Sequence, residues 1–179
     1  PFTQIAGDLS LLPKPLKMNK LMLTCAERAE IIVDFGKYQP GDEVVLYSDN
    51  TPLLHFRIHE FKPDHTKLPD ILFETPNPAV SPEMPVHYVT LDGMDEAVAM
   101  NGKKFKMDRI DYQMPMHKVQ LWDIENTNHA PGMIHPYHMH GTGFVTVSRD
   151  GHTPNPNELG LKDTIAINPG EHVLLKVWF

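Results

Sequence analysis

Residues 135–141 read His-Pro-Tyr-His-Met-His-Gly, and they place three imidazoles within six residues at the start of an apolar run. Because successive side chains of a strand point to opposite faces, we expect His138 and His140 to face the same way. His135 is expected on the preceding turn, where Pro136 directs it elsewhere. One short segment can therefore serve two separate metal centres. Imidazole binds copper and zinc, and also iron and nickel, so the spacing does not identify the ion, and plain polar alternation on an exposed strand is the competing interpretation.

Four further segments surround this motif. They are residues 101–109 (NGKKFKMDR), 119–126 (VQLWDIEN), 143–149 (GFVTVSR) and 161–171 (LKDTIAINPGE). Together with the histidine motif, and in this order, they resemble the carboxy-terminal cupredoxin domain of multicopper oxidases of the laccase-like group. Residues 1–61, through segments that include Ile5–Asp8 and Glu27–Phe35, resemble the back half of the middle cupredoxin domain of the same family.

The resemblance implies an all-β fold made of two cupredoxin-like Greek-key β-sandwiches, both incomplete. Residues 1–61 would form the carboxy-terminal part of the middle domain, and 86–179 the amino-terminal part of the carboxy-terminal domain. Residues 62–85 hold six prolines and little periodicity, which predicts an interdomain linker. Hydrophobic patterns bounded by turn residues predict strands near 21–23, 29–35, 43–48, 53–61, 86–91, 104–107, 117–125, 143–148, 164–167 and 172–178.

The chain also departs from the family. A complete enzyme of this kind draws its copper ligands from four motifs, and only one of them is here. Outside residues 135–141 there is no HxHG pair and no HxH pair, and there is no His-Cys-His segment. The sequence stops at residues 176–179 (KVWF), where the next strand and the cysteine are expected. We therefore expect an internal piece of a larger protein. Cys25 belongs to the middle domain, so we do not expect it to be the copper thiolate, and one cysteine forms no intrachain disulfide.

Carried over onto this sequence, the resemblance implies a copper ligand role for each histidine of the motif. His135 would ligate the type 1 copper, which takes electrons from a donor. His138 would ligate the type 2 copper and His140 one of the type 3 pair, which together reduce dioxygen to water. The complete parent would hold up to four copper ions. Metal-bound imidazoles usually donate their second N–H to an oxygen, and Asp163 is the candidate for that contact, although an ordinary polar residue at the start of a strand is the simpler interpretation.

The composition narrows the class of partners. Sixteen Lys and Arg against 23 Asp and Glu give a net charge of −7, which argues against nucleic acid. No apolar run approaches the roughly 18 residues needed to span a bilayer. Seventeen prolines are nearly twice the usual share of about 5% and disfavour long helices. Export to the periplasm or outside the cell follows only from the family resemblance.

Two function classes remain open. In the first, the parent is a copper-dependent oxidase that couples one-electron oxidation of a phenol or metal ion to four-electron reduction of dioxygen. In the second, it is a copper-free cupredoxin-like protein with a structural or interaction role, as in relatives that have lost their copper. The intact histidine motif favours the oxidase. A single ion bound by this chain alone is disfavoured, because His135 should face away from the other two histidines.

The piece by itself is expected to be inactive. Its three ligands would belong to different copper sites, and it provides no thiolate for a blue copper centre. Incomplete sandwiches leave open strand edges and uncovered apolar faces. We therefore expect the piece to need the remainder of its parent chain as a partner, and to form oligomers or aggregates without it.

Overall fold

The computed structural model describes residues 1–179, and the chain is all-β, as predicted. Two short 3₁₀ turns, η1 and η2, accompany the strands, and no α-helix forms. The elements are β1 Phe2–Ala6, β2 Leu11–Met18, β3 Glu30–Ile32, β4 Glu43–Ser48, β5 Thr51–Arg57, β6 Val86–Asp92, η1 Asp95–Ala97, β7 Ala99–Met100, β8 Val119–Asn126, β9 His135–His138, β10 Phe144–Arg149, η2 Pro156–Glu158, β11 Thr164–Ile167 and β12 His172–Trp178. No element is a helix of the length and hydropathy needed to cross a bilayer.

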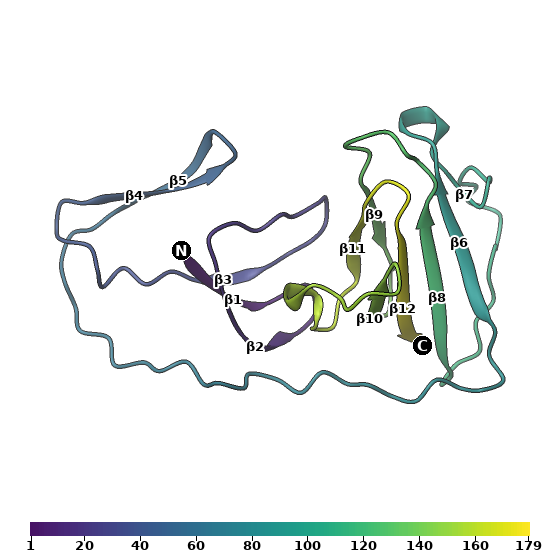
Figure 1. Ribbon diagram of the computed structural model, residues 1–179, viewed down its shortest axis with the longest axis horizontal. Helices are drawn as coiled ribbons and strands as arrows, with labels where there is room; N and C mark the ends of the chain where they lie inside the picture. The colour runs from purple at the N-terminus through teal and green to yellow at the C-terminus, as the bar shows by residue number, and fades with distance from the viewer.

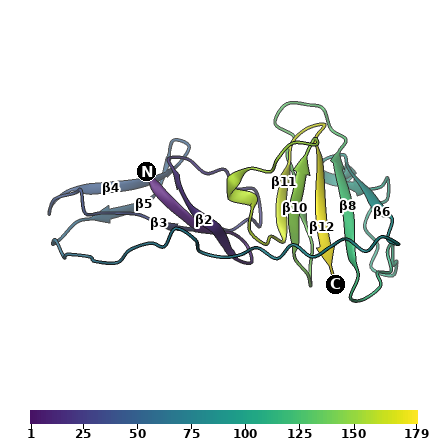
Figure 2. The ribbon, with the colours of Figure 1, turned by 60° about the horizontal axis from the view of Figure 1, so that its bottom comes forward.

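The strands gather in two bodies joined by a long stretch without strands (Figure 1). The first body holds the three-stranded sheet β2-β1-β3 and the β4–β5 hairpin. The second body holds the five-stranded sheet β10-β12-β8-β6-β7 and the two-stranded sheet β11-β9. Figure 2 shows the strands of the second body side by side and the connecting stretch running past both bodies. The edge of the first body that carries β1 and β2 approaches η2 and β11 of the second.

The hydrophobic core lies in the second body, between its two sheets. Every second residue of β8 is buried, because strand side chains alternate between faces. In the sheet, Ile124 of β8 lies opposite Val89 of β6 on one side and Val173 of β12 on the other. Tyr137 of β9 and Ile165 of β11 belong to the same buried cluster. The two sheets therefore cover one shared apolar layer, which is the arrangement of a β-sandwich.

Two of the predicted strands, at 21–23 and 104–107, are wrong. Alternation of apolar and polar residues predicted the second of them, yet Phe105 and Met107 are 83% and 89% exposed. A strand needs a neighbour to satisfy its backbone groups, and no strand pairs with this segment. Residues 104–107 have the alternation of a strand, but the fold places no neighbouring strand beside them.

β1 and β2 were not predicted, and β2 contains two prolines, Pro13 and Pro15. Proline has no N–H to donate and is therefore confined to sheet edges. β2 lies at the edge of the β2-β1-β3 sheet. Its pairing with β1 is retained at the strand end, where Phe2 lies opposite Met18.

A buried ion cluster holds one end of the second body together. Arg149 of β10 donates to both carboxylate oxygens of Glu158 in η2, at 2.5 and 2.8 Å, and to both oxygens of Glu171, at 2.8 Å. Its Nη2 also donates to the carbonyl oxygen of Ala166 at 2.9 Å. Burial by itself lowers the pKa of Arg149, but the two carboxylates outweigh burial and raise it above the ordinary value. One guanidinium thus links β10, η2, β11 and the turn before β12.

Replacing Arg149 by methionine should destabilise the protein far more than the same change at Arg57. Arg149→Met leaves two buried carboxylates without a cation, which costs about 3–5 kcal/mol. Arg57 pairs with Glu43 at the surface, with 74% of its side chain exposed, and such pairs contribute less than about 1 kcal/mol. Urea denaturation of Arg149→Met and Arg57→Met measures the difference. Equal unfolding midpoints would contradict a stabilising role for the Arg149 cluster.

Candidate metal centre

β9 carries the histidine motif and pairs with β11. The two strands are antiparallel, with Ile167 opposite His135 and Thr164 opposite His138. His135 is the first residue of β9, so the prediction that it lies on a preceding turn is wrong. Pro136 fits within the strand because β9 has a single neighbour, and proline is tolerated where one edge of a strand is free.

Strand alternation separates His135 from the other two histidines. His135 shares a face of β9 with the buried Tyr137, whereas His138 lies on the opposite, exposed face. His140 follows two residues after His138, and the centroids of the two rings lie 4.6 Å apart at an interplanar angle of 66°. Met139, between them, packs against the core. The structure therefore brings His138 and His140 together and leaves His135 apart.

His138 is held through one of its two ring nitrogens. Nδ1 lies 3.0 Å from the carbonyl oxygen of Asp163 and 2.8 Å from Oγ1 of Thr164. A carbonyl oxygen can only accept, so Nδ1 carries the proton and donates it. No hydrogen bond engages Nε2, which keeps its lone pair. A metal-binding imidazole is usually in this state: one ring nitrogen is free to ligate, and the N–H of the second ring nitrogen donates to an oxygen.

Asp163 approaches His138 more closely through its main chain than through its carboxylate, whose Oδ1 lies 3.5 Å from Nδ1. The carboxylate accepts from the Thr164 hydroxyl at 2.8 Å and from two guanidinium nitrogens of Arg28 at 2.6 and 2.7 Å. Arg28 chiefly, with Thr164 in addition, holds the pKa of Asp163 below its ordinary value against the effect of burial.

Arg28 is the residue at this site that sequence reasoning missed. It lies 135 positions from Asp163, in the segment between β2 and β3, and only the fold brings the two side chains together. The nearest sequence signal is the Glu27–Phe35 segment, which carries the family resemblance but gives no reason to connect Arg28 with a histidine.

His135 belongs to a second polar cluster. Nδ2 of Asn128 donates to Nε2 of His135 at 2.9 Å, and no hydrogen bond engages Nδ1. Burial raises the pKa of the neighbouring Asp92, but hydrogen bonds from Gly102, Thr127 and Thr90 bring it below its ordinary value. Because Nε2 accepts the Asn128 N–H, the proton of a neutral His135 ring lies on Nδ1, the opposite requirement from an imidazole whose unbonded nitrogen keeps its lone pair.

The chain contains no group of three or more His, Cys, Asp or Glu side chains arranged to hold a metal ion. The candidate ligands are two adjacent imidazoles in one place and a single imidazole in another. Cys25 is exposed and lies between β2 and β3, outside both clusters. As a donor, the His138 imidazole, with Nδ1–H bonded to oxygen and Nε2 unbonded, fits copper and zinc.

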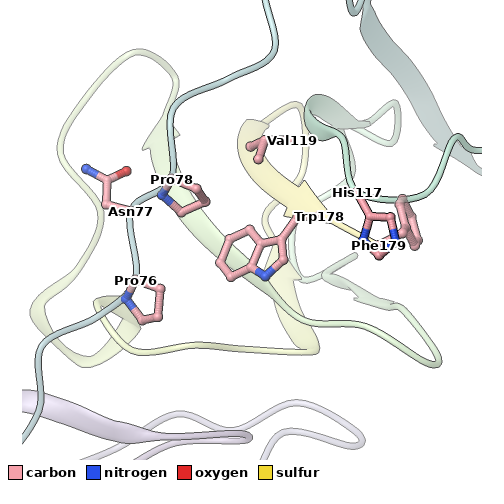
Figure 3. A pocket seen from close by; sticks show the side chains of 7 residues that line it. All are labelled: Pro76, Asn77, Pro78, His117, Val119, Trp178 and Phe179. Carbon is pink, nitrogen blue, oxygen red and sulfur yellow. The ribbon is translucent and has the colours of Figure 1, made fainter.

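A surface pocket of about 400 Å³ lies elsewhere on the second body (Figure 3). Its walls come from the connecting stretch, from the start of β8 and from the end of β12, and they comprise Pro76, Asn77, Pro78, His117, Val119, Trp178 and Phe179. In Figure 3 the indole of Trp178 lies between Pro78 and Pro76 on one side and Phe179 on the other. None of the three motif histidines lines this pocket, so it is separate from the candidate metal centre.

A family model described as multicopper oxidase matches residues 79–179, which is more than half of the chain. The chain belongs to the multicopper oxidase family. It is 32% identical over 180 residues to a multicopper oxidase of Staphylococcus haemolyticus, in a match that covers 99% of the chain and 37% of that relative. It is also 27% identical over 195 residues to the cell division protein FtsP of Xenorhabdus nematophila, covering 99% of the chain and 40% of that protein.

The crystal structure of a multi-copper oxidase from Pediococcus acidilactici matches with a TM-score of 0.95 and 47% identity. The match covers 99% of this chain and 38% of that one. The predicted cupredoxin-like β-sandwich fold is therefore confirmed. The chain spans about two fifths of the length of these relatives, so the activity of a whole oxidase is a matter for the proposal below.

In protein labelled with ¹⁵N-histidine, His138 should be the Nδ1–H tautomer, because the carbonyl of Asp163 accepts a proton from that nitrogen. The measurement is a long-range ¹H–¹⁵N correlation at a pH well above the ordinary histidine pKa of about 6.5. His55, exposed on β5 and without a side-chain hydrogen bond, is the control and should exchange between both tautomers. An Nε2–H form of His138 would contradict the arrangement described here.

Proposed function

We propose that this chain is one segment of a longer copper-dependent oxidase and contributes three of its copper ligands. The observation that carries the proposal is the division of the histidine motif between two places on β9 and the residues after it. Neither place holds three ligands, whereas a blue copper centre takes two histidines and a cysteine thiolate. Each place is therefore suited to a centre that other parts of a longer protein complete.

In this proposal His135 ligates the type 1 copper, His138 the type 2 copper and His140 one of the type 3 pair. The 4.6 Å between the rings of His138 and His140 supports ligation of neighbouring ions. Copper, up to four ions, supplies one-electron chemistry between a donor and dioxygen. The chain's own part is to hold the rings: Asp163 and Thr164 anchor His138, and an amide anchors His135.

The same proposal assigns residues 1–61 to a middle cupredoxin-like domain, 62–85 to a linker and 86–179 to a carboxy-terminal cupredoxin-like domain. It is supported by the sheets, because no strand of the first body pairs with a strand of the second. The electron donor is a phenol or a metal ion. The segment alone is inactive, because it lacks a complete set of ligands for any copper ion.

In the longer copper-loaded protein, His135→Ala should abolish the thiolate-to-copper absorption at about 600 nm and keep the type 2 copper signal in electron paramagnetic resonance. His138→Ala should do the reverse, because the two rings lie on opposite faces of β9. His152→Ala, at an exposed turn, is the control and should keep both. Loss of both signals in each of the two ligand variants, or of neither, would refute the assignment.

The 179-residue segment without the rest of its parent should self-associate. Several large apolar side chains lie open to solvent, among them Leu53 (58% exposed), Phe61 (64%), Phe105 (83%) and Met107 (89%). The β4–β5 hairpin also pairs with no third strand, and an isolated hairpin is marginally stable in water. Light scattering should give a mass well above the 20.3 kDa of one chain. A monodisperse 20.3 kDa monomer would show that these surfaces need no cover.

A copper-free structural or interaction role is the second candidate, and the similarity to the cell division protein FtsP is the observation that favours it. The intact histidine motif with its anchored rings favours the oxidase. Copper analysis of the longer protein separates the two. Protein that contains no copper after growth with copper, and shows no absorption at about 600 nm, would support the second candidate and refute the first.

A further inference from the structure

Arg28 is fixed in one orientation by four hydrogen bonds from its two terminal nitrogens. Nη1 donates to the carbonyl of Ala26 at 2.7 Å and to Oδ1 of Asp163 at 2.6 Å. Nη2 donates to the carbonyl of Asp8 at 3.0 Å and to Oδ2 of Asp163 at 2.7 Å. Arg28 and Asp8 belong to the first body and Asp163 to the second, so the guanidinium connects the two bodies.

The chain of contacts continues from Asp163 to His138. The Thr164 hydroxyl donates to Oδ1 of Asp163 at 2.8 Å. Because that proton is committed to the carboxylate, the Thr164 oxygen is left as an acceptor, and it lies 2.8 Å from Nδ1 of His138. The carbonyl of Asp163 is a second acceptor for the same N–H, at 3.0 Å. Arg28 therefore orients the Asp163 carboxylate. That carboxylate orients the Thr164 hydroxyl, which in turn holds the His138 ring.

We propose that Arg28 is a positioning residue for His138, acting from the first body through Asp163 and Thr164 to keep Nε2 free and aimed at its metal ion. The inference rests on the proposed copper function. A lysine could supply the charge but not the two parallel hydrogen bonds of the guanidinium fork, so the geometry and not the charge alone is required.

Holding the two bodies together is a separate task, which buried ion pairs perform. Lys162 lies 3.0 Å from Asp8 and 3.4 Å from Glu27, with side chains that are 6%, 0% and 8% exposed. The Arg28 side chain is 46% exposed but that of Asp163 only 13%, so this bidentate pair also adds to stability, and the test therefore compares the two copper sites. His135 makes no contact with this chain of residues, because its partner is Asn128. We therefore expect Arg28 to affect the copper that His138 ligates and not the copper that His135 ligates.

The test uses the longer copper-loaded protein with Arg28→Lys and Arg28→Gln. Both variants should lose type 2 copper to a chelator at least about 10-fold faster than the unaltered protein, within the range found when partners of ligating histidines are changed. Their absorption from type 1 copper should stay unchanged. Arg57→Lys and Arg57→Gln are the matched controls, because Arg57 is also a surface arginine of the first body paired with a carboxylate.

A second pair of variants tests the intermediate step. Thr164→Val removes the hydroxyl between Asp163 and His138 and should reproduce the loss of type 2 copper, whereas Thr164→Ser keeps the hydroxyl and should retain the copper. Type 2 copper retained in the Arg28 variants would overturn the proposal. So would equal loss of type 1 and type 2 copper with a lowered urea midpoint, because that result describes a structural role only.

The tautomer of His138 in the metal-free longer protein distinguishes this inference from the proposed function. Arg28→Gln should convert the single Nδ1–H tautomer into a mixture, as seen by long-range ¹H–¹⁵N correlation, and an unchanged single tautomer would overturn the positioning role. A protein that never binds copper, but whose His138 responds in this way, would refute the oxidase and support the positioning contact.

Discussion

The antiparallel pairing of β9 with β11 sets the position of every polar contact around His138. Because Thr164 lies opposite His138, its hydroxyl and the adjacent carbonyl of Asp163 reach the ring without a long, flexible side chain. The same pairing directs Tyr137 and Ile165 into the core. A shift of register by one residue would expose both apolar side chains and turn the histidine inward. The hydrophobic effect, acting on the neighbours of His138, therefore fixes the geometry of a candidate ligand.

Charged side chains connect the two bodies close to this strand pair. Burying Lys162 with Asp8 and Glu27 removes three charges from water, and the cost of doing so offsets much of their attraction. We interpret these pairs as fixing one arrangement of the two bodies rather than as a large source of stability. Once that arrangement is fixed, the more exposed Arg28 can reach Asp163 with ideal fork geometry. The contacts that join the two bodies thus lead directly to the contacts around His138.

Sequence patterns predicted β8 and β12 well, because both strands are buried on one face and their apolar residues alternate. They also predicted that His138 and His140 lie together. The patterns did not predict β2, whose prolines are tolerated because it lies at a sheet edge. They wrongly predicted a strand at 104–107, where apolar and polar residues alternate but no neighbouring strand is available. The fork between Arg28 and Asp163 could not be predicted, since nothing local in the chain relates residues 135 positions apart.

In the proposed oxidase, a single strand carries ligands for separate copper centres and so sets the spacing of those ligands. His135 and His138 are three residues apart on β9, which places their backbone positions about 10 Å from each other along a strand. A loop would let this separation vary, whereas a strand paired with β11 and packed on the core does not. Any small movement of β9 displaces both rings together and leaves their spacing unchanged. In the proposed oxidase, the path between the site that receives electrons and the site that reduces dioxygen would therefore keep a constant length while the rest of the protein moves.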